Sequence, residues 1–161
     1  MRSIRLVAVI LAVLVGFTSC SRDPAVVKKR YLESGNKYFD KGRYKEASIQ
    51  YRNALKRDPK YGAAYYKLAL VSLKMRDGGG ALSALRRAVE LIPLDQPDHW
   101  DAVSTLSDLF LLGAREATRE VAKQLIDEVE TFTKKLLEHD PNSFDGHRLK
   151  GDLNFYYATD A

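Results

Sequence analysis

Small and aromatic residues recur along the chain with a period of 34 positions, separated by stretches rich in charged residues. Shifting residues 28–61 forward by one period, without a gap, places them on like residues of the next segment. The matched pairs are Tyr31 with Tyr65, Gly35 with Ala69, Ala47 with Ala81, Tyr51 with Leu85, Ala54 with Ala88, and Pro59 with Pro93. A period of this length is typical of arrays in which each unit is a pair of antiparallel helices. The pattern therefore predicts an all-α chain of stacked helix pairs.

Apolar spacing and helix-ending residues predict the helices within each unit. We expect helices over residues 26–40, 44–56, 61–75, 81–91, 100–112, 115–139 and 144–157. Gly42 suits the left-handed backbone that ends the first helix, and residues 77–80, with three glycines, are expected to form the turn of the second unit. Gly113 is expected to end the helix that begins at residue 100, and Ala117 to be the small residue of the helix that follows.

The helix predicted over residues 115–139 is unusually long for such a unit. At about 1.5 Å per residue it would reach roughly 37 Å and project past its neighbours. We expect this overhang to be either a packing cap or a docking ridge for a partner. No second helix follows residues 144–157, so the last helix is either a terminal cap or part of a longer array that the sequence truncates.

The repeat resembles the tetratricopeptide repeat (TPR), a 34-residue helix–turn–helix unit. The first unit matches that pattern at Tyr31, Gly35, Tyr38, Ala47, Tyr51, Ala54 and Pro59, and the second departs from it where Ser72 replaces an aromatic residue. The resemblance implies a helical solenoid of about three and a half repeats over residues 27–161. The units would span residues 28–61, 62–95, 100–141, with an elongated second helix, and 144–161 in part.

The first nineteen residues are typical of a signal peptide. A short basic start precedes the apolar run Leu6–Phe17, which is too short to span a bilayer. Residues 17–20 resemble the lipobox of bacterial lipoproteins, which implies lipidation of Cys20, the single cysteine. The resemblance and Ser21 after that cysteine imply a lipid anchor in the cell envelope, at the outer membrane and facing the periplasm, with residues 20–26 as a tether. An ordinary signal peptide cleaved nearby is the alternative.

Charge is distributed unevenly along the chain. The net charge is +7 over residues 28–61, +2 over residues 62–95 and −6 over residues 96–161. The basic end lies nearest the expected anchor, where it could rest on anionic headgroups or attract an acidic partner. Most of these side chains are also consistent with ordinary solvated helix surfaces. Nucleic acid is a poor candidate partner for an exported protein.

Catalytic motifs are not apparent. The three histidines form no His-x-x-x-His pair, no second cysteine exists, and no Gly-x-Ser-x-Gly elbow occurs. The three glycines at residues 78–80 lack the following Lys-Ser or Lys-Thr of a phosphate-binding loop. We therefore expect no catalytic residue, no metal site and no cofactor.

The TPR resemblance implies a concave groove lined by side chains of the first helix of each unit. By position, the groove residues are Asn36, Phe39, Tyr66, Lys67 and Lys74. Asn36 and Lys67 match positions of the family's carboxylate clamp, but Leu32 stands where that clamp needs lysine. We expect this groove to suit an extended peptide with apolar and acidic residues. Phe39 is equally consistent with packing between helices.

These observations predict a non-enzymatic scaffold, a membrane-anchored TPR lipoprotein that binds other proteins or peptides in its groove. The envelope processes that fit are secretion, outer-membrane assembly and polysaccharide export, and the sequence does not choose among them. The alternative is an accessory protein that binds anionic glycans or lipid headgroups through the basic first repeat. The oligomeric state is not predicted.

Overall fold

The computed structural model describes residues 23–159, which form seven α-helices and no strand. The helices are α2 (Pro24–Asp40), α3 (Tyr44–Arg57), α4 (Gly62–Lys74), α5 (Gly78–Leu91), α6 (Pro97–Ala114), α7 (Arg119–His139) and α8 (Phe144–Thr159). The all-α prediction is confirmed. The expected signal segment, the lipidation site Cys20 and the first residues of the tether lie outside the described residues.

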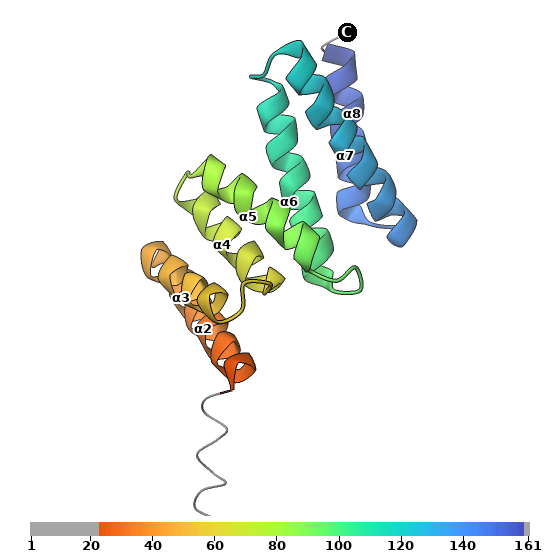
Figure 1. Ribbon diagram of the computed structural model, residues 1–161. Coiled ribbons are helices and arrows are strands. Elements are labelled where there is room, and N and C mark those ends of the chain that lie inside the picture. Colours follow the sequence, from red (N-terminus) through yellow and green to blue (C-terminus); the bar gives the residue numbers. More distant parts are fainter. Residues whose placement is uncertain (1–22, 160–161) are drawn as a thin grey trace, which may run out of the picture.

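The helices form three consecutive pairs followed by a single helix, and the pairs stack along one direction (Figure 1). The first helices of successive units contact one another: α2 contacts α4, α4 contacts α6, and α6 contacts α8. The backbones of the second helices, α3, α5 and α7, make no such contacts with each other. The first helices therefore lie side by side as the inner row of a solenoid, and the second helices form its outer row.

Small residues allow the two helices of a pair to approach closely. Ala47 and Ala54 of α3 are fully buried, and Gly35 of α2 lies directly against the ring of Tyr51. A Cβ atom added at Gly35 would overlap that ring. The aromatic side chain thus fills the space that the glycine leaves open, which explains why these residue types recur at a fixed spacing.

The hydrophobic core is divided into two clusters. A small one at the first pair is centred on Ala47, Tyr51 and Val71. A larger one extends from α4 to α8 and includes Leu85, Phe110 and other buried residues of every later helix. Each pair therefore buries its apolar face partly against the next pair, as expected for a repeat array.

The turn predicted at residues 77–80 is wrong, because the turn of the second unit lies a few residues earlier in the chain. Gly78, Gly79 and Gly80 form the first turn of α5, and the chain reverses at residues 75–77, where Arg76 has a φ of 59°. The Asp77 side chain accepts a hydrogen bond of 2.8 Å from the backbone N–H of Gly80. This N-cap stabilises the helix start and offsets the low helix propensity of glycine.

Two boundaries around α6 and α7 also differ from the prediction. Helix α6 begins at Pro97, which suits the first position of a helix, and it continues through Gly113 to Ala114. Helix α7 begins only at Arg119, so it has 21 residues, or about 31 Å, rather than the longer helix expected from residue 115. Ala117 lies in the connection, and Ala122 is the buried small residue of α7.

The first helix begins earlier than expected. Asp23 caps α2 by accepting a 2.8 Å hydrogen bond from the N–H of Ala25, and Pro24 occupies the first turn. Residues 24–26 of the expected tether are therefore helical. Gly42 has a φ of 71°, which confirms the left-handed position predicted at the end of α2.

Candidate functional site

The inner row presents one continuous face formed by α2, α4, α6 and α8. Near its centre, side chains from three of these helices surround a cleft of about 380 Å³. The lining residues are Tyr66 from α4, Asp101, Ser104, Thr105 and Asp108 from α6, and Asp145 and Arg148 from α8. Three carboxylates and a single guanidinium thus share a small, mostly polar hollow.

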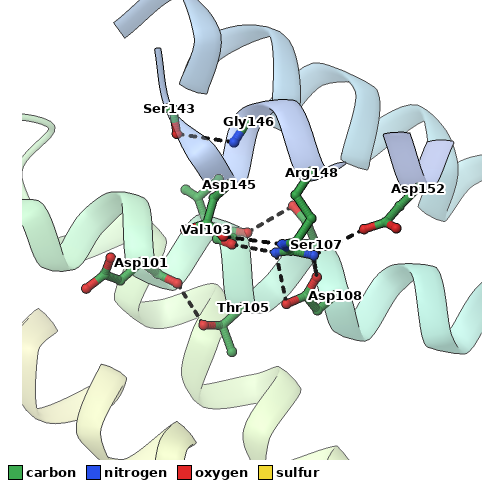
Figure 2. A network of polar contacts seen from close by, with 11 residues as sticks. Asp101, Val103, Thr105, Ser107, Asp108, Ser143, Asp145, Gly146, Arg148 and Asp152 are labelled. Atoms are coloured by element: carbon green, nitrogen blue, oxygen red, sulfur yellow. Dashed lines mark hydrogen bonds and ion pairs between the residues drawn. The ribbon is translucent and has the colours of Figure 1, made fainter. Parts of the chain in front are cut away.

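Arg148 connects α8 to α6 across the cleft (Figure 2). Its Nη1 atom lies 2.7 Å from Asp108 Oδ1, and its Nη2 atom donates to Ser104 Oγ at 3.0 Å. The guanidinium also contacts Asp145 at 3.3 Å and Asp152 at 3.1 Å on its own helix. Burial alone would lower the pKa of Arg148. Hydrogen bonds to Asp108 and Asp145, together with the attraction of their charges, outweigh this effect of burial, so the pKa of Arg148 is raised.

Asp101 stands apart from this network. The carboxylates paired with Arg148 are those of Asp108, Asp145 and Asp152, and within residues 23–159 Asp101 has no cation within 4 Å. Burial raises the pKa of Asp101, and the nearby carboxylates of Asp98 and Asp145 raise it further, while Lys67 opposes them. The cleft therefore contains a carboxylate in a negative field that Lys67 only partly offsets.

Tyr66 forms the floor of the cleft on the α4 side. Its side chain is 7 % exposed and belongs to the larger hydrophobic cluster. Within the described chain its hydroxyl donates no hydrogen bond, and the hydroxyl of the adjacent Thr105 donates instead to the carbonyl of Asp101 at 2.7 Å. Burial raises the pKa of Tyr66, as do the carboxylates around it, whereas Thr105 lowers it. Because this O–H group lines the cleft and has no acceptor among the described residues, it is free to donate to a ligand oxygen or to water.

The groove residues predicted from the sequence are spread over two helices. Tyr66 lines the cleft, and the ammonium group of Lys67 lies 5.2 Å from the Tyr66 ring centroid. Asn36 accepts a 2.8 Å hydrogen bond from the buried Tyr51 hydroxyl. Phe39 packs edge-on against Tyr44, with ring centroids 5.4 Å apart. Lys74 is exposed in the last turn of α4.

The polar residues of α6 and α8 are the part of the site that the sequence reasoning missed. Aligning Ala102, Leu106 and Phe110 with the second unit places Asp101, Ser104, Thr105 and Asp108 at the same unit positions as Ala63, Tyr66, Lys67 and Leu70. The unit positions of Asn36, Tyr66 and Lys67 correspond to Asp108, Ser104 and Thr105 in the third unit, and that of Tyr66 to Arg148 in the fourth, whereas Asp101 and Asp145 lie outside these positions. The irregular connection at residues 92–96 interrupts the period and hides this equivalence.

A larger hollow of about 970 Å³ lies at the C-terminal end of the solenoid. It is lined by the connection between α6 and α7, the start of α7, and Tyr156 and Tyr157 of α8. No group of three His, Cys, Asp or Glu side chains in the described residues is arranged to hold a metal ion. Within residues 23–159, no helix has the length and apolar character that crossing a bilayer requires.

Antiparallel helix pairs stacked in one direction, with small residues at each pair interface, define an α-helical repeat solenoid. Residues 35–75 match the family model described as TPR repeat. No curated protein matches the sequence. The chain has the tetratricopeptide-repeat fold, as the resemblance predicted.

Solved TPR structures support this fold over most of the chain. The first TPR domain of Spaghetti (RPAP3), bound to the HSP90 peptide SRMEEVD, is 22% identical with a TM-score of 0.63, covering 82% of this chain and 94% of that one. The second TPR domain of human RPAP3, in complex with the HSP70 peptide SGPTIEEVD, is 16% identical with a TM-score of 0.58, covering 81% and 95%. TTC0263, a thermophilic TPR protein of Thermus thermophilus, is 23% identical with a TM-score of 0.62, covering 81% and 66%.

Proposed function

We propose that the chain is a non-enzymatic scaffold that binds a polypeptide segment on its inner helix row. The observation that carries this proposal is the cleft formed by three consecutive first helices, which gathers polar and charged side chains on the inner row. Two TPR domains of similar fold are described as bound to peptides, SRMEEVD in one case and SGPTIEEVD in the other. A partner in the same location would contact helices from several repeats at once.

We further propose that the scaffold operates at a cell envelope, anchored through a lipidated Cys20. The sequence supports this role through the basic start, the short apolar run and residues 17–20. Replacing Cys20 with alanine should release the protein from the membrane fraction, because the acyl chains would be absent. A Cys20→Ala variant that still sediments with membranes would contradict the anchor.

Capture of partners from envelope extracts by the full chain tests the scaffold. The inner-row variant Lys67→Glu/Lys74→Glu changes two side chains of α4. The matched control, Arg52→Glu/Lys56→Glu, makes the same change of charge on α3 of the outer row. Loss of a captured polypeptide with the first variant only supports inner-row binding. Equal capture by both variants places binding elsewhere, and capture of no polypeptide by the native chain contradicts the scaffold.

A second candidate function is favoured by the basic first repeat. Exposed lysines and arginines cover both of its helices, and they include Lys29, Arg30, Lys37, Lys45, Arg52 and Lys56. This surface would suit anionic glycans or lipid headgroups. Binding to anionic vesicles that weakens steeply with added salt, and is lost in Arg52→Glu/Lys56→Glu, would support this alternative.

A further inference from the structure

The charges on the inner row change sign between its two halves. Lys67 and Lys74 are the charged inner-row residues of α4, whereas α6 contributes Asp101 and Asp108, and α8 contributes Asp145. The cleft lies where these halves meet, and Arg148 is its single internal cation. A polypeptide lying along the row would therefore meet a negative field at α6 and α8.

Arg148 does not neutralise this field. Its guanidinium is held by Asp108 and by Ser104, which is itself 6 % exposed, and it also contacts Asp145 and Asp152 (Figure 2). Several carboxylates share a single positive group, and among the described residues Asp101 forms no ion pair, although Lys67 partly offsets its charge. Like charges gathered in a partly buried hollow repel one another, so a cation from outside would relieve the repulsion.

The Tyr66 hydroxyl is an independent indication that a ligand belongs in this cleft. Its ring is more than nine-tenths buried, yet its O–H group faces the hollow and donates to no described residue. A backbone carbonyl of a bound polypeptide would accept this hydrogen bond. A carboxylate ligand would also accept it, but it would be placed among three aspartates, which is electrostatically unfavourable.

We infer that the cleft between α4, α6 and α8 binds a lysine or arginine side chain of an extended polypeptide, with the cation at Asp101 and the adjoining backbone carbonyl at Tyr66. This inference rests on the proposed scaffold function and specifies its partner. The C-terminal half of the row would then select basic segments. It would disfavour acidic peptides of the kind that the similar RPAP3 domains are described as binding.

Two labelled peptides and the full chain test this inference by fluorescence anisotropy. One peptide is SRMEEVD, and the other is SRMKKVK, in which lysine replaces each of the three acidic residues. We expect the lysine peptide to bind more tightly, and its affinity to fall about tenfold in Asp101→Asn, the loss typical of one charge-assisted hydrogen bond. Tyr66→Phe should weaken it by roughly threefold while leaving its salt dependence unchanged, because only a neutral donor is removed.

The matched control is Glu116→Gln, which removes one exposed negative charge from the connection between α6 and α7, away from the cleft. This variant should change the affinity for SRMKKVK by less than about twofold, as expected for a screened surface charge. Equal losses in Asp101→Asn and Glu116→Gln would indicate general attraction to an acidic surface and would overturn the cleft. Circular dichroism should show the same helix content in all three variants.

The remaining outcomes separate this inference from the scaffold itself. Preference for SRMEEVD, with binding that Lys67→Glu weakens and Asp101→Asn does not, would overturn the basic-segment inference and leave inner-row binding intact. Absence of measurable binding by SRMKKVK would also overturn the inference. The scaffold function would then still be judged by partner capture with the α4 and α3 variants.

Discussion

Gly35 and Gly151 occupy the same position of their repeat units, one near each end of the described solenoid. A Cβ atom at Gly35 would overlap the ring of Tyr51, whereas nothing lies within 4 Å of a Cβ atom at Gly151. The difference arises because α2 is covered by α3, while α8 has no second helix packed on that side in the described residues. A repeat-signature residue is therefore under packing constraint only where its partner helix is present.

The same two ends differ in charge while sharing one scaffold. The first pair is strongly basic and carries its own small core around Tyr51. The end formed by α6, α7 and α8 is acidic and shares the large core with α4 and α5. Buried positions preserve the stacking, and exposed inner-row positions vary, so the fold and the binding chemistry are set by different residues.

The largest expected effect concerns the core of the first pair. Tyr51 is fully buried and is the main large side chain of the small cluster, so Tyr51→Ala should lower the free energy of unfolding by about 3–5 kcal/mol. Chemical denaturation measures the loss. Hydrogen exchange should show that α2 and α3 lose protection first. Uniform loss of protection across all helices would show that the two ends are not separable.

Alkaline pH should destabilise the same pair through the Tyr51 hydroxyl. Burial raises the pKa of Tyr51 from 10.0 to about 12, with a further contribution from Asp40. The unfolded chain therefore loses this proton at lower pH than the folded chain. The stabilisation is fully present below pH 10 and is lost as pH rises towards 12, by roughly 2–3 kcal/mol.

Unfolding free energies measured across this pH range in the native chain and in Tyr51→Phe provide the test. The phenylalanine variant keeps the ring but has no proton to lose, so its stability should fall less steeply. It also lacks the hydrogen bond to Asn36, which lowers its stability at neutral pH by about 0.5–1.5 kcal/mol. Parallel pH profiles for the two proteins would exclude Tyr51 as the cause.

The two glycines make the comparison of the ends quantitative. Gly35→Ala should cost about 1–3 kcal/mol, because the new methyl group forces the Tyr51 ring to move. Gly151→Ala should instead stabilise the chain by about 0.5–1 kcal/mol, since alanine favours the helix and meets no neighbour. Thermal and chemical denaturation of the two variants measure the loss of stability in one and the gain in the other. Equal costs would indicate that a helix also covers Gly151.

The smallest expected effect is at the polar cleft. Arg148→Met removes contacts between α6 and α8 that are partly exposed and screened by solvent, so it should cost at most about 1 kcal/mol. The difference from the native chain should shrink as salt is added. A cost that does not depend on salt would mean that Arg148 acts through its hydrogen bond to Ser104 rather than through its ion pairs.

Much of the fold was predictable because its determinants lie close together in sequence. The spacing of Tyr31, Gly35, Ala47 and Tyr51 predicts one helix pair, and its repetition predicts the next. Boundaries were less predictable where two local preferences compete. Glycines at residues 78–80 suggest a turn, but the cap from Asp77 makes them helical. Similarly, Gly113 suggests a helix end, although α6 continues to Ala114.

The sequence by itself determined that this chain forms stacked helix pairs, because a pair with small residues at fixed spacing hides its apolar face only against another pair. The tertiary structure decided which exposed residues form a site. Tyr66, Asp101 and Arg148 are separated by 35 and 47 positions along the chain, and only the stacking of the inner row brings them to one cleft. Their electrostatics depend on distance through space and on burial, neither of which the repeat period encodes.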